Sequence, residues 1–162
     1  MSDQTRGAAL LNSKVEAVSC PSDVVTVLSV SPFEEDHQNL QSIFDHSNWT
    51  LHRSFACREA VEFLKNNQTP VVVSEKELVD HCWKFMLDEL EHLPMQPRPR
   101  LIVTSRLADD QLWSAVLNLG GYNVLEKPFE RNEVYWVISH AWLDWRAEWN
   151  RRQHSQSARA AG

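Results

Sequence analysis

The stretch PVVVSE, residues 70–75, combines a short apolar run with a charged residue at its end. Three consecutive valines are typical of a β-strand that is buried on both faces, as in the middle of a parallel sheet. Glu75 would then lie at the carboxyl end of that strand, the edge of an open α/β sheet where ligands bind. The question is whether Glu75 is a reacting or metal-binding carboxylate, or only the polar end of a buried strand.

Four further segments have the character of strands, and amphipathic segments separate them. The predicted strands are residues 24–30, 50–55, 70–75, 100–105 and 122–128. The segments with helical periodicity are residues 32–47, 57–67, 78–93, 108–121 and 130–153. This alternation of strands and helices implies parallel pairing through right-handed crossovers. We therefore expect an α/β fold, a flavodoxin-like, doubly wound (βα)5 sandwich with a five-stranded parallel sheet.

The two ends of the chain differ from this pattern. Residues 1–22 mix small and polar residues with two short apolar patches, which predicts a flexible N-terminal extension. Residues 154–162 are predicted to be a disordered C-terminal tail. The domain itself is then expected to span residues 23–153.

The composition argues against several classes of protein. Hydrophobic residues make up 43% and charged residues 23%, a balance typical of globular rather than disordered chains. The formal net charge of -6 argues against a nucleic-acid-binding surface, which needs concentrated positive charge. No apolar run reaches the roughly 18 residues of a membrane span, and no secretory signal is recognisable. Three cysteines without CxxC spacing favour a reduced, cytoplasmic protein.

With the elements placed, the order of motifs over residues 24–147 resembles that of bacterial response-regulator receiver domains. LGGYNVLEKPF, residues 119–129, is similar to the turn, fifth strand and Lys-Pro-aromatic signature of that family. PVVVSE is similar to the third strand, which in the family ends in the phosphate-accepting aspartate. IVTSR, residues 102–106, is similar to the fourth strand, which ends in a switch Thr or Ser. The resemblance implies a two-component or phosphorelay signalling domain and not an enzyme.

The resemblance also implies which positions would carry the chemistry. In the family an aspartate accepts a phosphoryl group as a mixed anhydride, and carboxylates at the end of the first strand hold Mg²⁺ beside it. The acceptor position falls here on Glu75, and the lysine that pairs with the phosphoryl group falls on Lys127. The acidic-pair positions fall on Ser31 and Pro32, and neither residue supplies a carboxylate.

The remaining positions concern the switch that follows phosphorylation in the family. Its hydroxyl falls on Thr104 or Ser105, between which the sequence does not decide, and its aromatic position falls on Val124. Since three of the five functional positions have changed, we expect a degenerate site that binds no metal or cofactor and accepts no phosphate. An ion pair between Glu75 and Lys127 is the physical expectation at such a site. The alternative is a solvated Glu75 without a partner.

Two other clusters invite a functional interpretation. The run EED, residues 34–36, could form a displaced metal site, but acids in the first turn of a helix are favoured by its dipole. The run DHC, residues 80–82, could suggest a nucleophile or ligands. Neighbours along a helix point in different directions and do not converge on one centre. We therefore predict structural roles for both runs.

The last predicted helix carries a stripe of tryptophans. At about 100° per residue, Trp142, Trp145 and Trp149 lie on one side together with Val134 and Ile138. The last two tryptophans lie beyond the usual end of the family's final helix, so we expect the core to leave them uncovered. Large apolar patches are unusual on soluble monomers. The stripe therefore predicts an interface, with a second chain or the N-terminal extension covering it.

Taken together, the sequence predicts an atypical receiver-like domain, a pseudo-receiver of bacterial signalling, that acts by protein–protein interaction. Its expected partners are a histidine kinase or a downstream effector, with a second copy as a further candidate; no contact with nucleic acid or membrane is expected. One alternative is a working phosphorelay receiver, phosphorylated at an acid on the third strand. Another is a small flavodoxin-like enzyme or nucleotide binder, because fold alone does not fix function. SVSPFEED, residues 29–36, contains no glycine, which argues against a phosphate-binding loop there.

Overall fold

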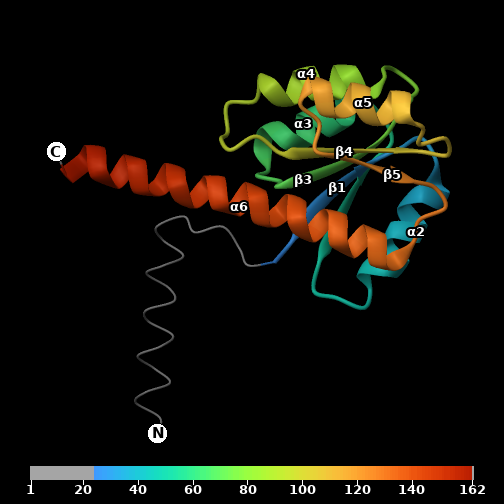
Figure 1. Ribbon diagram of the computed structural model, residues 1–162, viewed down its shortest axis with the longest axis horizontal. Helices are drawn as coiled ribbons and strands as arrows, with labels where there is room; N and C mark the ends of the chain where they lie inside the picture. Colours follow the sequence, from blue (N-terminus) through green and yellow to red (C-terminus); the bar gives the residue numbers. More distant parts are fainter. Residues whose placement is uncertain (1–23, 162) are drawn as a thin grey trace, which may run out of the picture.

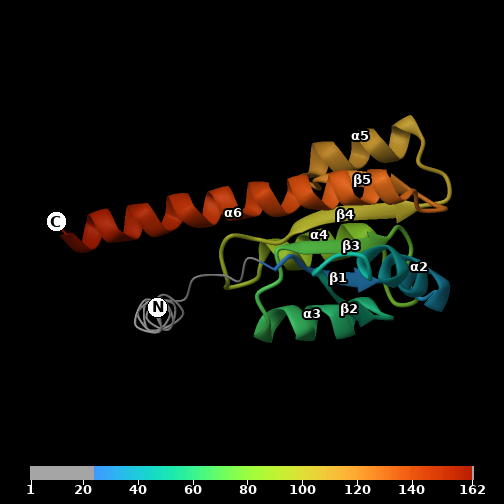
Figure 2. The same cartoon turned by 90° about the horizontal axis from the view of Figure 1, so that it is seen from below.

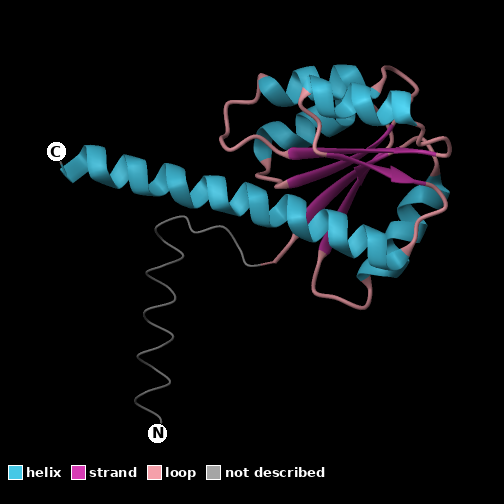
Figure 3. Cartoon of the chain, viewed as in Figure 1, coloured by secondary structure: helices cyan, strands magenta, loops and turns pink. Residues whose placement is uncertain are grey.

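The computed structural model describes residues 24–161, in which a parallel sheet lies between two layers of helices (Figures 1 and 3). The elements in chain order are β1 Thr26–Val30, α2 Glu34–Phe44, β2 Thr50–Ser54, α3 Cys57–Asn66, β3 Val71–Glu75, α4 Trp83–Glu91, β4 Arg100–Ser105, α5 Asp110–Leu119, β5 Asn123–Glu126 and α6 Arg131–Ala161. All neighbouring strands pair in parallel, in the order β2-β1-β3-β4-β5. The predicted flavodoxin-like fold is confirmed. The predicted N-terminal extension, residues 1–22, lies outside the described residues.

The apolar core consists of two clusters, one on each face of the sheet. Alternate side chains of each strand point to opposite faces, so Val72 packs beneath α3, α4 and α5, whereas Val71 and Val73 pack beneath α2 and α6. Figure 1 shows these two helical layers above and below the sheet. Both faces of β3 are therefore buried, as its run of valines predicts, and its last residue lies at the open edge of the sheet.

The turn between α5 and β5 depends on its two glycines. Gly120 ends α5 with φ of 101°, in the left-handed region that residues with a Cβ rarely adopt. At Gly121 a Cβ would lie only 2.5 Å from Cγ1 of Val116, so a side chain has no room there. These two residues let α5 turn tightly into β5, which carries Lys127 to the site.

Helix α4 begins later than the sequence predicts. α4 starts at Trp83, and residues 76–82 form a loop in which the amide of Leu78 donates to the carbonyl of His81. The carboxylate of Asp80 accepts hydrogen bonds from the amides of Cys57 and Arg58, at 2.9 and 3.0 Å. This acid therefore caps the N-terminus of α3 across 23 positions of sequence. The expectation that the run 80–82 lies on a helix is wrong, because this long-range cap holds the segment as a loop.

The last helix is longer than predicted. α6 continues through Ala161, so the expectation of a disordered tail is wrong for residues 154–161. No proline or glycine interrupts the segment, and its alanines and arginines are strong helix formers. An ion pair between Glu148 and Arg152, four residues apart, adds local support at 3.4 Å. Residues 150–161 are exposed throughout and project from the body of the domain (Figures 1 and 2).

The predicted tryptophan stripe is only partly exposed. Trp145 is 1% exposed, and its Nε1–H donates to the carbonyl of Pro97 at 3.1 Å. Trp149 stacks on it with ring centroids 5.6 Å apart, and Arg146 lies 5.1 Å from the ring centroid of Trp142. The expectation that the core leaves Trp145 uncovered is wrong, because the loop before β4 contacts it. Within residues 24–161, no helix has the length and apolar character needed to cross a lipid bilayer.

Candidate functional site

The candidate site is a cluster of charged side chains at the carboxyl edge of the sheet. Lys127 follows β5, Glu75 ends β3, and Asp36 lies in the first turn of α2. The Nζ of Lys127 lies 2.5 Å from Oε2 of Glu75 and 2.9 Å from Oδ2 of Asp36. The three side chains are 8%, 11% and 10% exposed, respectively. The predicted Glu75–Lys127 ion pair is present, and the structure adds a second carboxylate to it.

Two hydroxyl groups complete the cluster. Thr104 donates from Oγ1 to Oε2 of Glu75 at 3.0 Å, and Ser31 donates from Oγ to Oδ2 of Asp36 at 2.6 Å. Each carboxylate is thus held by one hydroxyl and by the lysine ammonium. The Oγ of Ser105 instead accepts from the amide of Leu107, so Thr104 is the hydroxyl that lies at the site. Among the described residues, every buried side-chain polar atom has a hydrogen-bond partner.

Asp36 is the residue of the site that sequence reasoning missed. The run 34–36 is predicted to have a role at the helix N-terminus. Asp36, however, is buried and points to Lys127, whereas Glu34 pairs with Arg53 at 2.9 Å. The missing carboxylates at Ser31 and Pro32 are a signal in the sequence that another acid must lie near Lys127. A buried lysine requires compensating charge, and the first turn of α2 follows that position directly. The helix-dipole argument is still compatible with Asp36, but it does not explain its burial.

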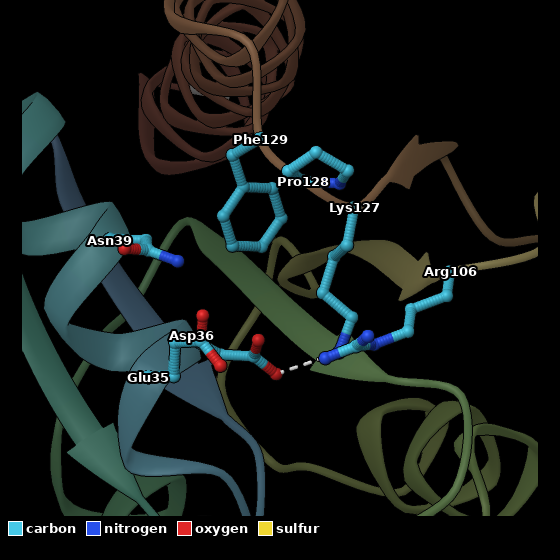
Figure 4. Close-up of a pocket in the computed structure, with 7 residues that line it drawn as sticks. All are labelled: Glu35, Asp36, Asn39, Arg106, Lys127, Pro128 and Phe129. Carbon is cyan, nitrogen blue, oxygen red and sulfur yellow. Dashed lines mark hydrogen bonds and ion pairs between the residues drawn. The ribbon is translucent and has the colours of Figure 1, made fainter.

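An aromatic side chain and a pocket adjoin the cluster. The Nζ of Lys127 lies 5.0 Å from the centroid of the Phe33 ring, which is 53% exposed. Figure 4 shows the pocket beside them, with Arg106 reaching toward the same space as Lys127 and with Phe129 and Asn39 on its wall. The ammonium of Lys127 is therefore flanked by two acids and an aromatic ring, and each acid is held by one hydroxyl.

His37 fixes the loop that places the acidic part of the site. It is fully buried, with Nδ1 2.9 Å from Oγ of Ser29 and Nε2 3.0 Å from the carbonyl of Ser31. Because a carbonyl only accepts, Nε2 carries the proton and Nδ1 accepts from Ser29. Burial lowers the pKa of His37 from its ordinary value of 6.5, although the hydrogen bond to Ser31 acts in the opposite direction. The imidazole therefore ties the end of β1 to α2.

This histidine predicts a loss of stability in acid. Because its pKa is 6.5 when unfolded and lower when folded, the unfolded chain takes up the proton first as pH falls. The contribution of His37 is therefore fully present above pH 6.5 and is lost as pH falls through the lower, folded pKa. We expect His37→Gln to show a smaller loss of unfolding free energy than the unaltered chain between about pH 7 and about pH 5 in urea titrations.

His92→Gln is the matched control for this prediction. His92 is exposed, and its backbone hydrogen bond to Asp88 raises its pKa above 6.5, so any contribution is present in acid and lost as pH rises. This variant should retain the acid loss of the unaltered chain. Equal pH slopes for His37→Gln and the unaltered chain would contradict the assignment.

The remaining sequence-predicted positions are placed as follows. Val124 is 1% exposed and belongs to the core cluster beneath α3, α4 and α5. Pro32 is half-buried in the loop between β1 and α2, where its neighbour Phe33 donates its amide to Oγ of Ser31 at 3.1 Å. No group of three or more His, Cys, Asp or Glu side chains within residues 24–161 is arranged to hold a metal ion. The site therefore offers two carboxylates whose shared cation is a lysine.

The comparisons with known proteins concern the fold. The sequence matches no protein-family model and none of the curated proteins. The signal receiver domain of an HD domain-containing protein from Pseudomonas fluorescens Pf-5 is similar in structure, with a TM-score of 0.72 and 22% identity over 82% of this chain and 97% of that chain. The chemotaxis response regulator CheY4 of Vibrio cholerae gives 0.66 and 12% over 73% and 98%.

A third similar structure is the beryllofluoride-activated receiver domain dimer of NtrC4. Its TM-score is 0.68 at 23% identity, over 74% of this chain and 98% of that chain. All three neighbours are response-regulator receiver domains, and almost the whole of each is covered. The chain therefore has the receiver-domain fold, the class that the resemblance in its motifs predicts.

Proposed function

We propose that the chain is a receiver-like signalling domain with a degenerate phosphorylation site, and that it acts through protein–protein contacts rather than catalysis. The observation that carries the proposal is the position of the Lys127 ammonium between the carboxylates of Asp36 and Glu75. In that position a cation of the chain itself is paired with both carboxylates of the site. A bacterial, cytoplasmic two-component system, with a histidine kinase or an effector as partner, is the setting that this proposal implies.

The chemistry of metal binding supports the proposal. Mg²⁺ sheds its waters reluctantly and needs several anionic oxygens to do so. Ser31 and Pro32 supply none, and Asp36, which lies next to Lys127 in their stead, is already bound by Lys127 and by the hydroxyl of Ser31. A lysine fixed to the chain occupies this place at any concentration of metal in solution. We therefore infer that Mg²⁺ has too little to gain at this site.

The geometry of Glu75 supports it as well. In the family a lysine and a hydroxyl bind the phosphoryl oxygens, and here Lys127 and Thr104 both bind Oε2 of Glu75 instead. The side chain of glutamate, longer than that of aspartate, brings its own oxygen to the two groups that would bind the phosphoryl oxygens. The site thus presents to them a carboxylate oxygen of the chain itself, in the absence of any phosphoryl donor.

The test is incubation with acetyl phosphate and Mg²⁺, followed by intact-mass measurement. We expect no phosphoryl adduct, whereas a conventional receiver treated in parallel should acquire one and so verify the donor. An acid-labile adduct that disappears in Glu75→Gln would sink the proposal in favour of a working phosphorelay receiver. Glu77→Gln, in the neighbouring loop, is the matched control for that assignment.

A further inference from the structure

The outward face of α6 carries a stripe of two large apolar side chains, two histidines and four small side chains. Trp136 and Leu143 are 60% and 54% exposed, and His140 lies 4.2 Å from the Trp136 ring, centroid to centroid. At 3.6 residues per turn they lie opposite the buried face of the helix. The α6 stripe consists of Trp136, His140, Leu143, Ala147, Asn150, His154, Ala158 and Ala161.

The stripe joins two halves of α6 that differ in their surroundings. Its first part lies on the body of the domain, over the sheet, whereas residues 150–161 project beyond it (Figure 2). A dozen helical residues without tertiary packing are marginally stable in water. We therefore expect residues 150–161 to pack against a partner. Most of their stripe residues are small, which leaves room for large side chains of that partner.

The charges of α6 indicate which partner fits. Residues 151–161 contain three arginines and no acid, whereas residues 131–149 contain three acids, Glu133, Asp144 and Glu148, and two arginines. Asp144 is half-exposed although it pairs with Arg100, so it remains accessible from outside. A suitable partner helix would place arginines next to the acids of residues 131–149 and small residues opposite Trp136. Residues 150–161 of a second copy have this composition.

We propose that α6 mediates an antiparallel, two-fold contact between two copies of this chain, centred near Ala147. This arrangement places Trp136 of one copy over the segment around Ala158 of the other, so that a large side chain meets a small one. Asp144 and Arg151 lie on the same flank of the stripe, and same-flank residues meet across an antiparallel pair. Each Asp144 then lies beside Arg151 of the second copy, and the two-fold axis makes this contact twice.

The opposite orientation fits the charges less well. In a parallel pair, residues five positions apart on opposite flanks meet, and Arg146 would lie beside Arg151 of the second copy. Two like-charge contacts would then replace two of opposite charge. The antiparallel inference rests on α6 alone and does not depend on the state of the Lys127 site. The phosphorylation experiment can therefore contradict the proposed function without affecting the proposed dimer, and the oligomeric state can contradict the dimer without affecting the proposed function.

The test is the oligomeric state of the full chain by sedimentation equilibrium. We expect a dimer, and we expect Trp136→Lys with Leu143→Lys to raise its dissociation constant by roughly a hundredfold, because the two largest apolar side chains of the stripe are lost from the interface. Leu117→Lys is the matched control, since Leu117 is 51% exposed on α5 and lies outside the stripe. Circular dichroism establishes that each variant is folded.

Two outcomes would overturn the inference. One is a monomeric full chain, and the other is a dimer that Leu117→Lys dissociates while the stripe variant does not. Orientation is tested by Arg151→Asp, which should weaken an antiparallel dimer by placing two carboxylates together. Combining it with Asp144→Arg should restore the affinity. A tighter dimer for Arg151→Asp alone would instead indicate the parallel arrangement, in which Arg146 gains an acidic neighbour.

Discussion

Lys127→Met is expected to lower the free energy of unfolding by about 3–5 kcal/mol, the range for stranding a buried charge. The ammonium is the cation shared by Oδ2 of Asp36 and Oε2 of Glu75. Without it two carboxylates face each other in a nearly buried pocket, and each retains one hydroxyl donor. Methionine keeps most of the apolar volume of the lysine stem, so the loss reports on charge and not on packing. Urea unfolding at constant pH measures it.

Glu75→Gln separates this network from a simple ion pair. In a pair it would strand the lysine, but here Lys127 keeps Asp36 and the cluster becomes neutral, so we expect a much smaller loss than for Lys127→Met. The double variant should recover part of the loss of Lys127→Met, since only one carboxylate then remains uncompensated. Losses that simply add in the double-mutant cycle would show that the three groups are not coupled.

Trp145→Ala is expected to lower the free energy of unfolding by about 3–5 kcal/mol, the usual range for truncating a large buried aromatic residue. The side chain is 1% exposed, stacks on Trp149 and donates to the carbonyl of Pro97. Alanine leaves a cavity between α6 and the loop before β4, and it also leaves that carbonyl without its donor. Urea unfolding measures the effect, and the slope of the unfolding free energy against urea concentration should stay unchanged.

Trp149→Ala is the control for this second substitution. Trp149 is only half-buried, so its loss should be clearly smaller than that of Trp145→Ala. A different result would be an unchanged free energy of unfolding for Trp145→Ala together with a changed oligomeric state. That result would contradict the stabilising role of Trp145 and would support the interface that the sequence predicts at this residue. Both variants lie off the α6 stripe, so neither should dissociate a dimer formed through it.

The strands could be predicted because each carries a short apolar run that fits a buried sheet. The helices were predicted less accurately where a distant residue decides the boundary. Apolar spacing alone gives residues 78–93 as one helix, but the cap that Asp80 makes on α3 keeps the first part as a loop. Likewise, the cover of Trp145 comes from Pro97, 48 positions away in sequence. No local pattern contains either contact.

The candidate site was predictable to the extent that motifs specify strand ends. Glu75 and Lys127 follow predicted strands, and the carboxyl ends of parallel strands meet at one edge of a sheet. Asp36 was not predicted to belong there, because the helix dipole already accounts for an acid in a first turn. His37 was missed for a related reason: its partners, Ser29 and the carbonyl of Ser31, are common groups that carry no recognisable motif.

Because α6 is long, a small tilt near its first turn would displace its far end by a much larger distance. Its 31 residues extend roughly 46 Å at about 1.5 Å per residue, and the helix begins shortly after Lys127. Tilting it by about 5° around its first turn would displace its far end by about 4 Å, more than the 1–2 Å helix shifts that separate states at many subunit interfaces. If the helix stays intact, a small tilt near the lysine would be magnified with distance along α6, and residues 150–161 would move most.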